Sequence, residues 1–101
     1  MDIKDLTREM NRFVDHQGWY QSASPRPQTL KNLACSLVIE SGEVLELLQW
    51  QDQPAHQTAF AAELADVTLY LLQLASVAGI DLEKAVLDKL DGNYQRTWDE
   101  E

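Results

Sequence analysis

Two pairs of carboxylates set inside apolar helical segments constrain this chain more than any other feature. Glu40 and Glu43 form the first pair, and Glu63 and Asp66 form the second. Residues three apart lie on one face of a helix, so the two acids of each pair point the same way. Carboxylates beside an apolar core are costly unless a cation balances them. The pattern therefore predicts two helices whose four acids surround a divalent cation, Mg²⁺ or in its place Mn²⁺.

The apolar residues of the chain recur at helical spacing and predict an all-α fold with four helices. We expect helices over about residues 2–17, 30–51 and 55–78, and a fourth from about 82 toward 94 or 98. Thr29 and Asp81 are suitable N-caps, and Gly18 and Gly79 are suitable stops. No segment shows the two-residue alternation of a strand, and the length of 101 residues suits a single domain over residues 1–101.

The positions of the acids beside the apolar stripes predict that the two pairs meet. Glu40 falls at the edge of the stripe of its helix, Glu43 lies one step further out, and Glu46 lies almost opposite the stripe. Glu63 and Asp66 nearly repeat the first two offsets on the next helix. Because the connection between these helices is short, we expect them to pack as antiparallel neighbours.

Composition narrows the classes of partner and of cellular location. The net charge of −9, from 17 acidic and 8 basic residues, argues against binding to long nucleic acids, which depends on Lys and Arg contacts to phosphate. We expect no apolar run that approaches the ~20 residues of a membrane span, and the N-terminus lacks the pattern of a signal peptide. We therefore expect no membrane partner and a cytoplasmic location. The single cysteine, Cys35, is expected to be buried and inert.

Several other chemistries are disfavoured by what the chain lacks. His16 and His56 stand far from the acidic pairs in helical register, which disfavours zinc. A di-iron bundle would need Glu-x-x-His on two helices, and a Walker or Rossmann phosphate loop is also absent. Mg²⁺ held by carboxylates keeps positions for water and substrate phosphates. Hydrolysis of a phosphoanhydride is therefore the chemistry that the acids favour.

The two acidic segments, Glu40-Ser41-Gly42-Glu43 and Glu63-Leu64-Ala65-Asp66, resemble the ExxE…ExxD signature of the MazG-like all-α nucleoside triphosphate pyrophosphatases. Further short matches lie at the family's spacing, and the resemblance to the short dCTP-pyrophosphatase-like branch runs over about residues 19–98. These matches are Lys31-Asn32-Leu33, Leu47-Leu48-Gln49-Trp50, and Lys89 with Asn93. The resemblance implies a four-helix MazG-like bundle that assembles as a dimer or a dimer of dimers, with sites between subunits.

The resemblance also implies an activity, namely Mg²⁺-dependent hydrolysis of (deoxy)nucleoside triphosphates to a monophosphate and pyrophosphate, as in nucleotide-pool house-cleaning. Carried over by position, the four acids would hold the metal, and one Glu would act as the base for the attacking water. The implied substrate-binding residues are Lys31, Lys89, Asn93 and Arg96 at the phosphates and Trp50 at the base. Trp19, beside Tyr20, either lines the substrate pocket or covers the core.

The chain departs from that branch at Pro27-Gln28-Thr29 and over residues 94–98, where base and phosphate contacts would lie, so base preference stays open. Two alternatives also stay open. One is a non-catalytic helical module that acts through oligomeric interaction. The other is a related dUTP or phosphoribosyl-ATP hydrolase on the same fold. In the enzyme hypotheses the partners are the nucleotide and one or three further copies of the chain, as a homodimer or homotetramer.

Overall fold

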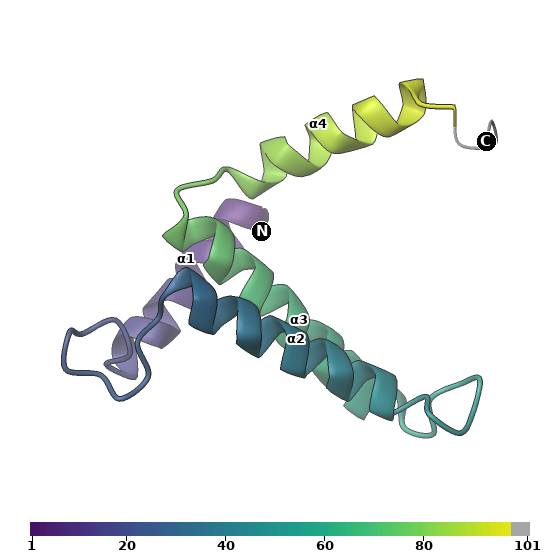
Figure 1. The fold of residues 1–101 in the computed structure, drawn as a ribbon, viewed down its shortest axis with the longest axis horizontal. Helices are drawn as coiled ribbons and strands as arrows, with labels where there is room; N and C mark the ends of the chain where they lie inside the picture. Colours follow the sequence, from purple (N-terminus) through teal and green to yellow (C-terminus); the bar gives the residue numbers. More distant parts are fainter. Residues whose placement is uncertain (98–101) are drawn as a thin grey trace.

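The computed structural model describes residues 1–97 and contains four helices in that range (Figure 1). They are α1 (Ile3–His16), α2 (Leu30–Glu46), α3 (Gln57–Val77) and α4 (Leu82–Gln95). Within residues 1–97 no strand is present, and the prediction of an all-α chain with four helices is confirmed. Trp98, the further of the two expected ends of the last helix, lies outside the described residues.

Local capping explains most helix boundaries. The Thr29 hydroxyl accepts a hydrogen bond from a backbone N–H in the first turn of α2, and the Asp81 carboxylate does the same for α4. Gly18 and Gly79 follow α1 and α3 with φ of 76° and 71°, a left-handed conformation that glycine adopts without strain. The expected start and stop residues therefore act at these four positions.

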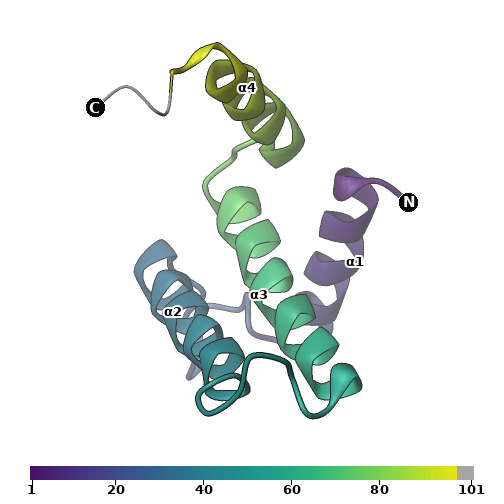
Figure 2. The same cartoon turned by 90° about the vertical axis from the view of Figure 1, so that its right-hand side faces the viewer.

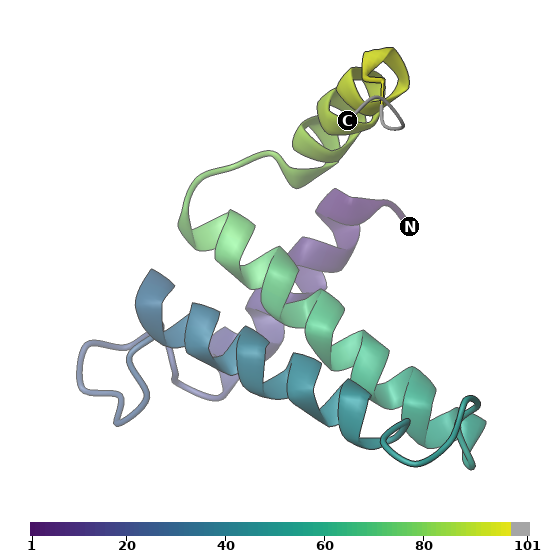
Figure 3. The ribbon, with the colours of Figure 1, turned by 45° about the vertical axis from the view of Figure 1, so that its right-hand side comes forward.

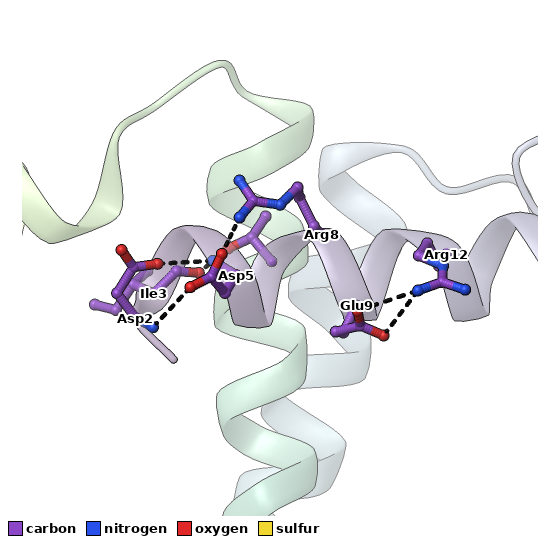
Figure 4. A network of polar contacts seen from close by, with 7 residues as sticks. Asp2, Ile3, Asp5, Arg8, Glu9 and Arg12 are labelled. Atoms are coloured by element: carbon purple, nitrogen blue, oxygen red, sulfur yellow. Dashed lines mark hydrogen bonds and ion pairs between the residues drawn. The ribbon is translucent and has the colours of Figure 1, made fainter.

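The polar face of α1 is held by contacts within the helix itself (Figure 4). Asp2 and Asp5 form a reciprocal capping box, and Arg8 pairs with Asp5. One turn further along, Arg12 lies 3.2 Å from a carboxylate oxygen of Glu9. These pairs are exposed, so they order the surface of α1 and contribute little to global stability.

Two predicted boundaries differ from the observed ones, the first because local turns follow α2. Helix α2 ends at Glu46 instead of near residue 51, since residues 47–50 form turns closed by backbone bonds such as Leu48 N–H to Leu45 C=O at 2.9 Å. Helix α3 begins at Gln57 instead of near residue 55, and no side chain caps its N-terminus.

Helix α3 is the centre of the fold, with α2 on one side and α1 on the other (Figure 2). Helices α2 and α3 run side by side over most of their lengths in opposite directions (Figure 3). Helix α4 extends away from this three-helix unit and makes its main helix contact with α1. The radius of gyration is 16.3 Å, well above the roughly 13 Å of a compact domain of this length, because α4 does not fold back.

The core within one chain is small. Met10 and Val14 of α1 pack against Leu72 of α3, and all three are at most 5% exposed. Many large apolar side chains stay open to solvent, especially on α2 and α4: Leu30, Val38, Ile39, Leu45, Val86, Leu87, Leu90 and Tyr94. Among the described residues, more large apolar side chains are exposed than buried.

On α2 and α3 the buried residues are not simply those of the apolar stripe that the sequence predicts. Leu64 and Leu71 of the expected α3 stripe are 45% and 43% exposed, whereas Leu72 is buried. The reason is that α1 as well as α2 packs on α3. Cys35, expected in the core, is exposed because α2 is covered mainly by α3 and its other face stays open.

Helix α3 is long and apolar enough, by length and composition, to cross a membrane, so the expectation that no apolar run approaches that length is wrong for this helix. Such a composition is also that of a central helix in a protein core, and one helix of this kind is weak support for a membrane protein. Helix α3 lies between α1 and α2 and carries Glu63 and Asp66 along its length.

Candidate metal centre and the adjoining pocket

Three of the four predicted acids converge where α2 and α3 run side by side. Glu40 and Glu43 come from α2, and Glu63 comes from α3. One carboxylate oxygen from each lies within 4.8 Å of the other two, and all three residues are half-buried. This spacing is short enough for the three oxygens to share one cation.

Two oxygens of this cluster are buried without a partner. Glu40 Oε2 and Glu63 Oε2 are shielded from solvent and receive no hydrogen bond from the part of the chain that the structure describes. Buried polar atoms nearly always have a hydrogen-bond partner, so two unpartnered oxygens at one place are available to bind a cation. Carboxylate oxygens are hard ligands, and the set fits Mg²⁺ or Mn²⁺.

The pKa values of two carboxyl groups in the cluster are raised, as is expected where negative charges lie close together. Burial, followed by the neighbouring Glu43 carboxylate, raises the pKa of Glu40 to about 7. The Glu43 carboxyl, followed by burial, raises the pKa of Glu63. Without a metal, the cluster therefore holds a proton in place of part of the missing positive charge.

The raised pKa of Glu40 predicts a pH dependence of stability in metal-free protein. As pH rises, the unfolded state releases the Glu40 proton near its ordinary pKa of 4.5, whereas the folded state keeps this proton up to about pH 7. The resulting stabilisation is complete below pH 4.5 and is lost as pH rises through about 7. We expect the variant Glu40→Gln, melted in chelator, to match the wild type near the acidic end and to exceed it in Tm above pH 7.

This pH prediction has a clear opposite outcome and a matched control. A Tm difference between Glu40→Gln and wild type that does not change with pH would contradict it. Glu46→Gln makes the same chemical change on the same helix at an exposed position and should show no such difference.

The fourth acid, Asp66, lies near the cluster but outside its shortest contacts. It is exposed, and its charge is one of those that raise the pKa values of Glu40 and Glu63. Asp66 also lines a neighbouring pocket. It therefore stands between the carboxylate cluster and that pocket.

The pocket beside Asp66 lies between α1 and α3 and has a volume of about 340 Å³. Its walls are mainly apolar and aromatic, with a few polar groups: Leu6, Glu9, Met10, Phe13, Val14, Trp19, Asp66, Leu69, Tyr70 and Gln73. This size and lining are typical of small-molecule sites in proteins. A ligand that spans the carboxylate cluster and the pocket would carry a charged end and a flat apolar end.

Trp19 is fixed at the wall of this pocket. Its ring meets Phe13 edge to face, with centroids 5.7 Å apart, and the Arg26 guanidinium lies 5.6 Å from the Trp19 ring centroid. Both contacts hold the ring at a set angle. The structure places Trp19 both at the wall of this pocket and against the core cluster, so it occupies both of the expected positions.

The remaining predicted substrate residues are not brought to the carboxylates within one chain. Lys31 is exposed nine positions before Glu40, about 14 Å along the helix. Trp50 is 89% exposed in the turns after α2. Lys89 and Asn93 lie on α4, and Arg96 comes directly after it. Helix α4 extends away from α2 and α3.

Sequence reasoning missed two pocket residues on α3. Tyr70 and Gln73 follow Asp66 by four and seven positions, so helical geometry places all three on one face. Both residues line the pocket. That periodicity was available in the sequence, but nothing there indicated that α1 leaves a space above this face.

Comparison with known proteins identifies the family of the chain. The family model described as the MazG nucleotide pyrophosphohydrolase domain matches residues 28–97. A pyrophosphatase from Archaeoglobus fulgidus has a similar structure, with a TM-score of 0.77 and 33% sequence identity. That similarity covers 91% of this chain and 88% of the archaeal one.

The chain is also similar to curated mammalian proteins. dCTP pyrophosphatase 1 of Rattus norvegicus is 37% identical and that of Homo sapiens 36% identical, each over 103 aligned residues. The alignment covers 93% of this chain and 58% of each relative, so the chain spans a little over half of their length. The family match and these identities confirm the resemblance stated from the sequence. The chain belongs to the MazG nucleotide pyrophosphohydrolase family.

Proposed function

We propose that this protein hydrolyses (deoxy)nucleoside triphosphates to a nucleoside monophosphate and pyrophosphate in a Mg²⁺-dependent reaction, as part of nucleotide-pool house-cleaning in the cytoplasm. The observation that carries the proposal is the carboxylate cluster of Glu40, Glu43 and Glu63, with two buried oxygens that lack partners. The names of the relatives and the family description support the same class of reaction.

The carboxylates would hold the cation, with Asp66 adding negative charge at the side of the pocket. When bound, Mg²⁺ would neutralise phosphate charge and lower the pKa of a coordinated water. A carboxylate of the cluster would take the proton from the attacking water, since these groups would lie beside the phosphates in this proposal. The raised pKa values of Glu40 and Glu63 reflect the negative charge and burial around these two carboxyl groups.

The pocket between α1 and α3 would receive the base. Trp19 and Tyr70 supply aromatic surface there, and Asp66 connects the pocket to the carboxylates. A nucleotide has the required shape, because its phosphates and its base lie at opposite ends of the sugar. The pocket volume of about 340 Å³ lies within the range of small-ligand sites.

We further propose that residues 1–101 form one domain that works as a homodimer or homotetramer. The exposed apolar residues of α2 and α4, among them Val38, Leu45, Leu87 and Tyr94, would be covered by other copies. Lys89, Asn93 and Arg96 would then contact phosphates held by the acids of a second copy, together with Lys31 and Trp50. This arrangement would account for the distance between the predicted residues within one chain.

The test is a substrate panel of the four common deoxynucleoside triphosphates, dUTP and phosphoribosyl-ATP, each with Mg²⁺ and with chelator, followed by chromatography of the products. We expect metal-dependent formation of a monophosphate and pyrophosphate from at least one deoxynucleotide. Reaction with phosphoribosyl-ATP or dUTP alone would favour the related hydrolases. Silence across the panel from folded protein would contradict the proposal and favour an interaction module.

A further inference from the structure

Gln73 is a polar side chain set deep in the wall of the pocket proposed for the base. It is 4% exposed, the only buried polar or charged residue in the part of the chain that the structure describes. It lines the pocket between α1 and α3 and also a second pocket of about 350 Å³ beside the loop at residues 25–28. Trp19 and Tyr70 line both pockets as well, so these three residues form the partition between them.

Both N–H groups of the Gln73 side-chain amide donate hydrogen bonds within the chain. Nε2 donates to Gln28 Oε1 at 2.6 Å and to the Tyr20 hydroxyl oxygen at 3.4 Å. The Tyr20 hydroxyl in turn donates to Asn11 Oδ1 at 2.5 Å, and Asn11 Nδ2 donates to Ser76 Oγ at 2.9 Å. Rotating the amide would place Gln73 Oε1 against the Gln28 acceptor, so the chain of bonds fixes its orientation.

The atom of the Gln73 side chain that remains available for a hydrogen bond is therefore the acceptor Oε1. No described residue donates a hydrogen bond to Oε1, which has two lone pairs. Gln73 as a residue is buried but lines the pocket, and an unpaired acceptor in a pocket wall favours a ligand that brings an N–H and disfavours one that brings an oxygen.

We propose that Gln73 is the base-selecting residue of this site and that its Oε1 accepts a hydrogen bond from an exocyclic amino group. The inference rests on the proposed function and deepens it. Bases with an amino group at the far end of the ring, cytosine above all, are then preferred over keto bases such as uracil. Cytosine and uracil have the same ring size, so the apolar walls cannot separate them.

The discrimination follows from what each base presents. The amino group of cytosine projects beyond its ring and reaches a deep acceptor. At the same place uracil presents a keto oxygen, and its ring N–H lies between two such oxygens. With uracil bound, this keto oxygen would face Gln73 Oε1, and neither acceptor would receive a hydrogen bond. A site built to bond a substrate N–H rejects an analogue that lacks it, here by about tenfold or more in kcat/KM.

The experiment measures kcat/KM for dCTP and dUTP in wild type, Gln73→Met and Gln57→Met. Methionine keeps the length and volume of the side chain but lacks the strong acceptor. We expect wild type to prefer dCTP by about tenfold or more and Gln73→Met to bring the two substrates within about threefold. Gln57→Met, an exposed change on the same helix, should keep the wild-type ratio.

The ratio separates selection from a structural role. Losing the bond to Gln28 loosens the loop, which would lower activity on both substrates together and leave their ratio unchanged. If Gln73→Met does not fold, Gln28→Met frees one N–H of the amide and should lower the ratio by a smaller factor. An unchanged ratio in the folded variant, or a wild type that does not prefer dCTP, would overturn the inference.

Calorimetric binding of dCMP and dUMP keeps this inference separate from the proposed function. The monophosphates need no turnover, so the measurement works even if no triphosphate is hydrolysed. Preference for dCMP that disappears in Gln73→Met supports Gln73 as the selecting residue whether or not hydrolysis is found. Hydrolysis with equal binding of dCMP and dUMP would overturn the inference and leave the proposed function standing.

Discussion

Glu40→Gln is expected to lower kcat/KM for a nucleoside triphosphate by about a thousandfold. The substitution keeps the shape of the side chain and removes the charge from the buried oxygens of the carboxylate cluster. A correctly held cation contributes several kcal/mol of charge stabilisation, and each factor of ten in rate corresponds to about 1.4 kcal/mol. Steady-state pyrophosphate release at saturating Mg²⁺ measures the loss.

The same variant should lose the stabilisation that Mg²⁺ gives to the folded protein. A ligand that binds only the folded state raises stability by about 2.7 kcal/mol at a concentration of 100 times its Kd. We therefore expect a Mg²⁺-dependent rise in Tm for wild type and little or none for Glu40→Gln. Glu46→Gln is the matched control, since Glu46 is exposed on the same helix, and it should retain both activity and the Tm rise.

Full activity in Glu40→Gln would show that the cluster does not hold the working cation. A Tm rise that survives in this variant would show that Mg²⁺ binds elsewhere. Because the metal-free variant is expected to be at least as stable as wild type above pH 7, loss of activity cannot be attributed to unfolding.

Subunit complementation is the prediction with the second largest effect. Lys89→Met removes a cation that we assign to the phosphates of a neighbouring copy, and it should lower activity about a hundredfold. Lys89 lies on α4, which extends away from the acids of its own chain. In a mixed assembly, the acids of a Lys89→Met chain can meet the intact Lys89 of a Glu40→Gln chain.

Mixing the two inactive variants, after mild dissociation and reassembly, should therefore restore activity to about a quarter of the wild-type level for a symmetric dimer. The fraction arises because half of the dimers are mixed and one of their two sites is intact. A mixture that stays as inactive as its components would contradict a site shared between copies. Glu40→Gln mixed with Glu63→Gln serves as the control, because both changes fall on the same cluster and no intact site can form.

The convergence of the acids could be predicted because it depends on local geometry. Spacing of three places Glu40 with Glu43 on one helix face, and the short connection makes α2 and α3 antiparallel neighbours. Caps such as Thr29 and Asp81 are also local, since the side chain bonds a backbone group three residues away. These features need no knowledge of how the remaining helices pack.

The pocket and the open helix faces could not be predicted because they depend on packing between distant segments. Gln73 acquires its role from Gln28, 45 residues away, and from Tyr20, 53 residues away. Periodicity identifies an apolar face but does not say whether the same chain or another copy covers it. This explains why Cys35 is exposed and why α4 leaves Leu87 and Leu90 open.

The most direct test of the central claim is pyrophosphate release from dCTP by the folded wild-type protein, measured first in chelator and then after addition of excess Mg²⁺. The carboxylate cluster predicts no release in chelator and sustained release of pyrophosphate with a monophosphate once Mg²⁺ is present. Equal release under both conditions, or release of single phosphates in place of pyrophosphate, would contradict the assignment of this cluster as the hydrolytic centre.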